Sequence, residues 1–316
     1  MFAIIYLLLN LLLQHLPLSC ANSNPSPPEI VVAISAHFSP RRVPFLHSTL
    51  QTFAQGYPPG TKVFVITNDK DQTLSSLSAL DPDLFKYPYE LTVIEPSEPL
   101  SDPHKLTWYH RKVFSTQFEG ASHKQIFLYI EDDIHVPYSH LVHWWSGADD
   151  LYESSKLISS FYRVDGDPTA PSLGFLTDQF KNCEGEIWDV AGTEFSVGGG
   201  HFVQLWNPYS ASYALSSTMM RDFVMMSEWD LNHLLSINPM GMDVRELAAS
   251  GMMFSNLQGP PFDRSTAVVP WDKASGALKI EGAVYHMDVS KEAPNWCWVV
   301  SEARKKQQQE QQQQEL

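Results

Sequence analysis

Three consecutive carboxylates, Glu131-Asp132-Asp133, follow a short apolar run near the middle of the chain. Carboxylates this close together repel one another at neutral pH unless a cation or several hydrogen-bond donors offset their charge. A hard divalent cation that keeps some of its waters suits one or two carboxylates together with a substrate diphosphate. The acidic triplet is therefore a candidate site for a metal ion and a diphosphate. The alternative is a solvated acidic turn.

A second candidate ligand lies late in the chain. The segment from Ile280 to Met287 predicts a short strand that delivers His286. An imidazole nitrogen suits a transition-type divalent ion such as manganese better than it suits magnesium. A lone histidine can equally be a structural residue with satisfied hydrogen bonds, and this alternative stays open.

The acidic triplet at a strand end, the order of the elements around it and the late histidine resemble the GT-A glycosyltransferases. Their DxD motif would take the variant form Glu131-Asp132-Asp133 here, and the resemblance covers roughly Glu29 to Lys291. In that family the last acid of the motif contacts the metal and the first contacts the ribose or the sugar. The resemblance implies Asp133 and His286 as metal ligands and Glu131 as a sugar-nucleotide contact, with Asp132 in either role.

Binding a diphosphate also requires positive charge. Arg41 and Arg42 follow the first predicted strand, where the nucleotide is expected to lie. Arginine forms two parallel hydrogen bonds to phosphate, which favours these two residues. Lys105, His110 and Arg111 lie on a predicted helix before the triplet and are further candidates. For Lys105 and Arg111 the alternative is a solvated helix face.

An inverting transferase needs a general base, which we expect to be an Asp or Glu from the second half of the chain. Asp243 and Glu246 are the preferred candidates because they open a predicted helix near the expected acceptor side. Asp243 equally fits a helix N-cap, which is the commoner role for such a position. A retaining enzyme needs no such base.

The elements that must position these residues alternate in type over the first half of the chain. Apolar runs at 30–35, 63–67, 91–94 and 126–130 predict strands, and apolar residues at helical spacing lie between them. Near-continuous apolar strands that alternate with helices are typical of a parallel sheet buried on both faces. Ligands of such sheets bind beyond the carboxyl ends of the strands, where the triplet lies. The predicted fold is α/β, with a GT-A-like, Rossmann-type, mostly parallel sheet flanked by helices.

The second half is less regular, and we expect it to bind the acceptor. Helices are predicted at 141–152, 220–226 and 243–253, strands at 158–163, 211–216, 267–269 and 283–286, and a glycine-rich loop at 198–200. We therefore predict one catalytic domain over 29–300, with a nucleotide-binding half at 29–133 and an acceptor half at 134–300.

Charge and missing motifs exclude several classes of protein. The chain has 36 acidic and 21 basic side chains, for a net charge of -15. A polyanionic nucleic acid would be repelled by this field, so we predict no nucleic-acid partner. The first strand is followed by no glycine-rich turn, which argues against a dinucleotide-binding site, and no Walker-type loop occurs.

The two ends of the sequence predict segments outside the catalytic domain. Residues 2–13 are almost entirely apolar, and Ser19 and Ala21 fit cleavage by signal peptidase, so 1–21 is a predicted signal peptide or signal anchor. The polar linker 22–28 follows. These features predict the secretory pathway, in the Golgi or ER lumen or as a secreted protein, with a possible membrane tether. An oxidising lumen would permit a Cys183–Cys297 disulfide. The Gln-rich residues 301–316 should be disordered.

Three hypotheses of function follow from these residues. The first is a metal-dependent glycosyltransferase that uses Mn²⁺ or Mg²⁺ and a nucleotide-sugar donor, with a glycan, protein or lipid as acceptor. The second is a luminal metallohydrolase that uses His37, Asp133 and His286, although HExxH and related spacings are absent. The third is a catalytically silent sugar-binding protein on the same scaffold. The triplet and the late histidine favour the first.

Overall fold

The structure is a computed structural model that describes residues 27–97, 103–120, 122–165, 175–176, 194–205, 209–237, 243–253, 266–275 and 277–287. The apolar segment 1–21, the Cys183–Cys297 pair and the Gln-rich tail lie outside the described residues, so the predictions about them stay predictions. Within the described ranges, no helix has the length and apolar character needed to span a bilayer.

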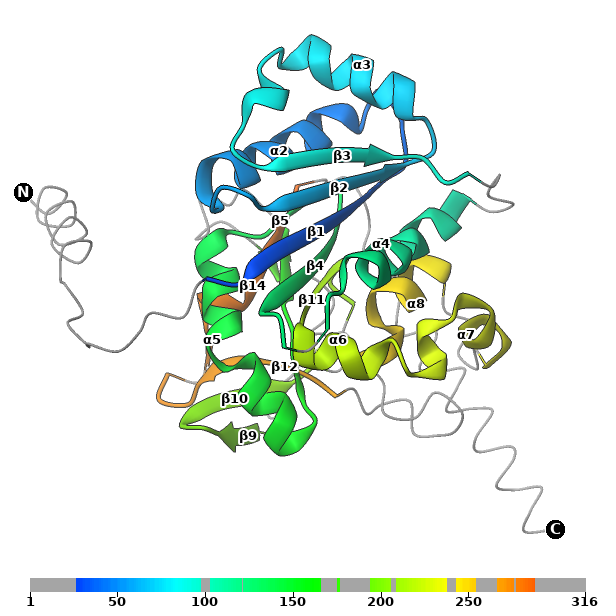
Figure 1. Cartoon of the computed structure of the whole chain (residues 1–316). Helices are drawn as coiled ribbons and strands as arrows, with labels where there is room; N and C mark the ends of the chain where they lie inside the picture. Colours follow the sequence, from blue (N-terminus) through cyan, green and yellow to red (C-terminus); the bar gives the residue numbers. More distant parts are fainter. Residues whose placement is uncertain are drawn as a thin grey trace, which may run out of the picture.

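A five-stranded sheet in the order β11-β4-β1-β2-β3 forms the main layer of the molecule (Figure 1). Its strands are β1 (Glu29–Ala36), β2 (Lys62–Thr67), β3 (Glu90–Ile94), β4 (Gln125–Glu131) and β11 (Ser212–Ser216). β1 to β4 pair in parallel, whereas β11 pairs antiparallel with β4. The predicted α/β class and mostly parallel sheet are therefore confirmed.

The continuous apolar runs form strands because both of their faces are covered. Val31, Val32, Ala33 and Ile34 of β1 are all fully buried, although successive side chains point to opposite faces. The covering helices of the first half are α2 (Val43–Gly56), α3 (Lys70–Leu80) and α4 (Tyr109–Gln117), with short 3₁₀ turns at Leu84–Lys86 and Pro103–Trp108. α4 packs on β1 and β2, and α2 packs against α3.

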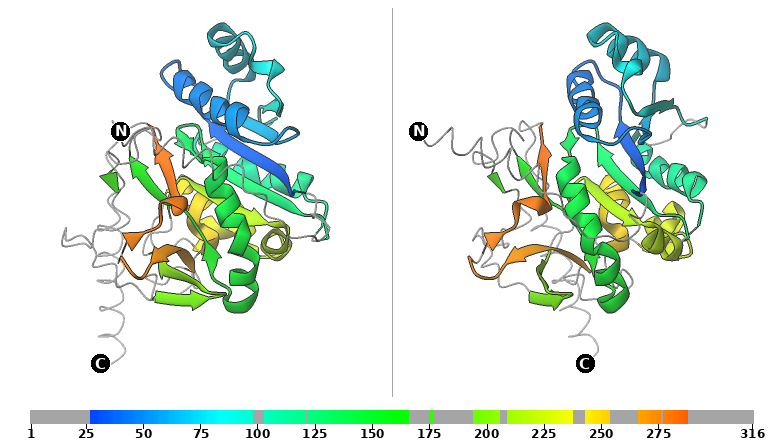
Figure 2. Two further views of the ribbon diagram at one scale, coloured as in Figure 1. Left: turned by 90° about the vertical axis from the view of Figure 1, so that its left-hand side faces the viewer. Right: turned by 60° about the vertical axis from the view of Figure 1, so that its left-hand side comes forward.

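The second half contributes smaller elements. Its helices are α5 (Tyr138–Ser155), α6 (Ser217–Phe223), α7 (Leu231–Ile237) and α8 (Val244–Ser250), with 3₁₀ turns at Ser227–Trp229, Gly251–Met253 and Ile280–Gly282. One small sheet has the order β13-β12-β10-β9, and β6 also pairs with β12; a four-stranded sheet has the order β5-β14-β7-β8. Figure 2 shows these sheets, with their orange C-terminal strands, gathered to one side of the sheet that contains the blue β1.

The strands of these small sheets are short. They are β5 (Ile134–His135), β6 (Ile158–Ser159), β7 (Tyr162–Asp165), β8 (Phe175–Leu176), β9 (Glu194–Val197), β10 (Gly200–Gln204), β12 (Ala267–Asp272), β13 (Ala277–Leu278) and β14 (Ala283–His286). The single strand predicted at 158–163 is wrong, because β6 and β7 belong to different sheets. Ser160 and Phe161 between them are also buried, so burial continues through the break and the apolar pattern does not reveal it.

The predicted glycine loop at 198–200 is a tight hairpin between β9 and β10. Gly200 pairs with Val197, which leaves Gly198 and Gly199 as a two-residue turn. Both have positive φ, at 57° and 81°. Such a turn requires left-handed backbone at both positions, and glycine adopts it without a steric penalty. Gly198 and Gly199 therefore have a structural explanation.

The strand order places the acidic triplet at a topological switch point. β1 lies between β2 and β4, so the connection after β1 leads to one side and the chain later returns on the other. In open α/β sheets, ligands bind at the carboxyl ends of the strands where the order reverses in this way. β14 pairs antiparallel with β5, which directly follows the triplet, and this pairing places His286 opposite Ile134.

Candidate functional site

The backbone of the acidic triplet is held from three sides. The Asp132 amide donates to the carbonyl of Ser35 in β1 at 3.2 Å, and the Thr49 hydroxyl of α2 donates to the carbonyl of Asp132 at 3.0 Å. The Met287 amide, just beyond β14, donates to the carbonyl of Asp133 at 2.9 Å. The turn after β4 is therefore fixed by both halves of the chain.

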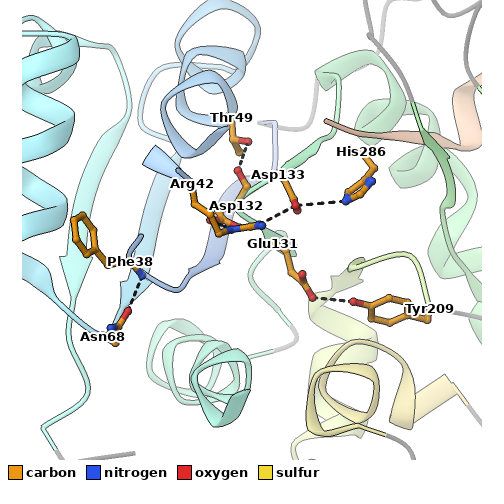
Figure 3. A network of polar contacts seen from close by, with 9 residues as sticks. All are labelled: Phe38, Arg42, Thr49, Asn68, Glu131, Asp132, Asp133, Tyr209 and His286. Carbon is orange, nitrogen blue, oxygen red and sulfur yellow. Dashed lines mark hydrogen bonds and ion pairs between the residues drawn. The ribbon is translucent and has the colours of Figure 1, made fainter. Parts of the chain in front are cut away.

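Asp133 and His286 lie side by side in the interior, as Figure 3 shows. The Nε2 atom of His286 is 3.4 Å from Oδ2 of Asp133. Only 1% of the Asp133 residue and 4% of the His286 residue are exposed. A carboxylate oxygen and an imidazole nitrogen are thus brought together from opposite halves of the chain.

Arg42 is the cation that faces the triplet. Its Nε donates to both carboxylate oxygens of Asp132, at 2.8 and 3.1 Å, and its Nη2 also contacts Asp132. The same Nη2 atom lies 2.8 Å from Oδ2 of Asp133. Figure 3 shows the guanidinium between the two carboxylates. The sequence prediction that Arg42 belongs to this site agrees with this arrangement, although its partners here are carboxylates.

Burial and charge act against each other in this cluster. Burial raises the pKa of Asp132 and the charge of Asp133 adds to the rise, while hydrogen bonds from Arg42 oppose it. Burial lowers the pKa of Arg42, but its bonds and charge interactions with Asp132 and Asp133 outweigh that effect and raise the pKa above its ordinary value. The guanidinium is therefore permanently charged and offsets part of the carboxylate charge.

Glu131 points away from this cluster. Its Oε1 accepts a hydrogen bond of 3.0 Å from the Tyr209 hydroxyl. Burial raises the pKa of Tyr209 well above its usual value, and the charge of Glu131 adds to the rise, so the phenol keeps its proton and donates. The charge of Glu131 also acts on Arg245 of α8. Glu131 therefore faces the second half of the chain, while Asp132 faces the first.

The donor atoms fit a divalent cation held partly by a substrate. Among the residues that the structure describes, no group of three or more His, Cys, Asp or Glu side chains is arranged to hold a metal ion. Asp133 and His286 would supply one oxygen and one nitrogen, both of which manganese accepts. Diphosphate oxygens and water would complete the shell, as is common for cations that bridge phosphates. Such an ion would contact the side of Asp133 that Arg42 occupies.

The predicted base residues form a capping box at the start of α8. The Asp243 carboxylate accepts from the Arg245 amide at 2.8 Å, and the Glu246 carboxylate accepts from the Asp243 amide at 2.9 Å. Hydrogen bonds from Arg245 lower the pKa of Asp243 although burial alone would raise it, whereas burial raises the pKa of Glu246. The helix-cap interpretation of Asp243 is confirmed, and a catalytic role for either residue stays a prediction.

The prediction that His110 or Arg111 could bind phosphate is wrong. His110 and Arg111 are buried, and both are bonded to the protein. Arg111 donates to the carbonyls of Glu228, Trp229 and Ala248, at 2.6, 3.1 and 3.3 Å, and its guanidinium lies 3.8 Å from the Trp108 ring centre. Helical spacing alone did not show that this face of α4 is covered by the second half of the chain.

The remaining cations and His37 lie nearer the surface. Arg41 is exposed in the turn before α2, and Lys105 is half-buried in the 3₁₀ turn before α4. His37, which the hydrolase hypothesis requires, is exposed just after β1. A pocket of about 220 Å³ lies elsewhere, between α5 and the β9–β10 hairpin, and none of the predicted site residues lines it.

Sequence reasoning missed Tyr209 and Thr49. Tyr209 lies in an irregular stretch before β11 with no periodic pattern that would single it out. Thr49 lies on the buried face of α2 among apolar residues, and its polar side chain at such a position was the available signal. A buried threonine needs a hydrogen-bond partner, and here that partner is the triplet's own backbone.

Comparisons with known proteins give matches among solved structures alone. No family model matches the chain, and no curated protein matches its sequence. The galactosyltransferase LgtC, in complex with donor and acceptor sugar analogues, is 11% identical with a TM-score of 0.38, over 87% of this chain and 94% of that one. A mannosyltransferase from Pyrobaculum calidifontis, in complex with GDP-Man and Mn²⁺, is 12% identical with a TM-score of 0.39, over 92% and 65%.

The third structure is TarS from S. aureus, which is 14% identical with a TM-score of 0.36, over 66% of this chain and 54% of that chain. The chain therefore spans about half the length of that TarS structure. At these identities and TM-scores the similarity carries no conclusion about function, which rests on the residues of the site.

Proposed function

We propose that the protein is a metal-dependent glycosyltransferase that takes a sugar from a nucleotide-sugar donor. The observation that carries the proposal is the meeting of Asp133 and His286 beside Arg42 at the switch point of the parallel sheet. Carboxylate and imidazole can bind a divalent cation, guanidinium can bind a diphosphate, and the switch point is where α/β sheets bind ligands. The predicted acidic segment therefore lies next to a guanidinium and an imidazole, which a site for a metal ion and a diphosphate can use.

In this reaction the bond between the anomeric carbon and the diphosphate oxygen breaks, and the nucleoside diphosphate leaves with the electron pair. An acceptor hydroxyl oxygen bonds to the anomeric carbon, and its proton passes to a base or to solvent. A bound divalent cation supplies Lewis-acid stabilisation of the leaving diphosphate. Asp133 and His286 would hold that cation, and Glu131, oriented by Tyr209, would contact the ribose or the sugar.

The cellular location is a proposal made from the sequence, and the acceptor is proposed as a broad chemical class. We propose a glycan, protein or lipid acceptor, met in the Golgi or ER lumen, because residues 1–21 read as a secretory signal or anchor. Asp243 or Glu246 would serve as the base if the reaction inverts the anomeric centre.

A thermal-shift screen of nucleotide sugars, each with and without Mn²⁺, tests the proposal. A ligand that binds only the folded protein raises the melting temperature with its concentration over its dissociation constant. We expect one donor class to stabilise the protein, and to do so more strongly with Mn²⁺. Stabilisation by no nucleotide sugar under either condition would refute the proposal. Release of free sugar without an acceptor, at a rate that acceptors leave unchanged, would favour a hydrolase.

A further inference from the structure

The two aspartates that face Arg42 are not equivalent partners. Asp132 receives the guanidinium edge-on, through both Nε and Nη2, which is the bidentate arrangement that arginine favours with carboxylates. Asp133 is contacted by Nη2, through Oδ2. Asp132 is therefore the stronger anchor, and the contact with Asp133 can be given up without releasing the side chain.

A single oxygen atom is shared by two neighbours. Oδ2 of Asp133 lies 2.8 Å from Arg42 Nη2 and 3.4 Å from His286 Nε2. A divalent cation bound by Asp133 and His286 would compete with the guanidinium for this carboxylate, and the two positive charges would repel each other. Without the cation, the guanidinium of Arg42 offsets part of the negative charge of these two buried carboxylates.

The position of Arg42 suits an exchange of partners. About 20% of its side chain is exposed, against 4% of the Asp132 side chain and 1% of that of Asp133. Arg42 is thus the most exposed of these three side chains. A guanidinium that leaves one carboxylate still has donors suited to a phosphate.

From these contacts we propose that Arg42 stays bonded to Oδ2 of Asp133 until a divalent cation binds there and displaces the guanidinium. Asp132 then keeps Arg42 beside the cation, where Arg42 binds the donor's diphosphate. This rests on the proposed function for the identity of the ligand. Arg42 is thereby a positioning residue for the metal and a binding residue for the diphosphate. Asp132 holds Arg42 and is not a metal ligand.

Mn²⁺ binding to the metal-free protein tests the exchange without any measurement of activity. Free Mn²⁺ would be counted by electron paramagnetic resonance for the wild type, Arg42→Met and Arg221→Met. Removing the competing charge should lower the Mn²⁺ dissociation constant of Arg42→Met by about tenfold or more, the size of effect that one close charge has on an ionisation. Arg221→Met removes an exposed arginine charge on α6 and should leave the dissociation constant within about twofold, since solvent screens that charge.

An unchanged or weaker Mn²⁺ affinity in Arg42→Met would overturn the proposal, as would Mn²⁺ binding to neither protein. If Arg42→Met is unfolded without metal, Mn²⁺ should refold it, because the cation takes over the charge compensation of the two aspartates. Failure of Mn²⁺ to refold such a variant would also overturn the proposal.

The second half of the proposal has its own measurement. At saturating Mn²⁺, Arg42→Met should bind UDP or GDP about tenfold more weakly than the wild type, since charge-assisted bonds to a phosphate are lost. Equal nucleotide affinity would overturn the diphosphate role. Failure of the proposed function would look different: the wild type would bind neither UDP nor GDP at any Mn²⁺ concentration, whatever Arg42→Met does to Mn²⁺ binding.

Discussion

His286 at the end of β14 lies with its Nε2 atom 3.4 Å from Oδ2 of Asp133, and β14 pairs with the strand that follows the acidic triplet. The second half of the chain therefore completes a cluster that the first half begins. Both side chains are buried, so their spacing is set by the packing of the two halves.

The first prediction concerns His286. His286→Gln keeps a polar group of similar reach but removes the imidazole nitrogen that would bind the metal. We expect the Mn²⁺ dissociation constant to rise by about 10- to 100-fold, the range seen when the support of a metal ligand is lost. Isothermal titration with Mn²⁺ measures this. His123→Gln, which changes an exposed histidine in the turn before β4, is the matched control. Equal Mn²⁺ affinity in His286→Gln and His123→Gln would assign His286 a structural role alone.

The second prediction concerns the orientation of Glu131. Tyr209→Phe removes one hydroxyl, and with it the 3.0 Å hydrogen bond to Glu131, while the ring is kept. We expect the donor KM to rise several-fold and the Mn²⁺ affinity to stay unchanged, because Asp133 and His286 are untouched. The free energy of donor binding should become less favourable by about 0.5–1.5 kcal/mol, which is typical of one hydrogen bond. A fall in Mn²⁺ affinity as large as that in His286→Gln would contradict the division of roles.

The third prediction concerns stability and a buried arginine. Arg111 donates to three carbonyl groups in the second half and stacks on Trp108, so it joins α4 to α8 and to the segment before α8. Arg111→Met leaves those carbonyls without their donor, and we expect the free energy of unfolding to fall by about 1–3 kcal/mol, the cost of leaving a buried acceptor unsatisfied. Urea unfolding measures it, with the exposed Lys112→Met as control. A loss below about 1 kcal/mol would show that the carbonyls find other partners.

The fourth prediction is a pH dependence set by His110. Its Nδ1 faces the carbonyl of Thr107, which only accepts, so Nδ1 carries the proton and Nε2 accepts from the Tyr213 hydroxyl. Burial, and secondly the charge of Arg111, lower the pKa of His110 well below its ordinary value. The unfolded chain therefore takes up this proton first, near pH 6.5. The contribution of neutral His110 to the free energy of unfolding is therefore fully present above that pH and is lost as the pH falls below it.

His110→Gln removes this titration. Between pH 6.5 and 5, the free energy of unfolding of the wild type should fall more steeply than that of the variant. The difference should be up to about 1.4 kcal/mol per pH unit, as expected for one proton. Urea unfolding at pH 7.5, 6 and 5 for both proteins measures the difference in slope, which is separate from any loss of stability common to all pH values. Parallel slopes would show that His110 is accessible to protons in the folded state.

The sequence predicted the parts of this structure that depend on local pattern. Continuous apolar runs that end at polar residues predicted the buried strands β1 to β4. The same pattern placed the acidic triplet at the end of β4. The pairing of Asp133 with His286 came only through a family resemblance, because no spacing rule links residues in different halves. Local pattern could not show that Arg42 turns back onto Asp132, nor that α4 is covered on the face of Arg111. Those contacts are set by tertiary packing.

The most direct test of the central claim is calorimetric binding of UDP and GDP, with and without Mn²⁺, to the wild type and to Asp133→Asn. The substitution keeps the size of the side chain and removes the charge that would hold the cation. We predict that Mn²⁺ strengthens binding of one nucleotide to the wild type by about tenfold or more, and that this gain disappears in a folded Asp133→Asn protein. The same Mn²⁺-dependent gain in both proteins would contradict the metal site at Asp133.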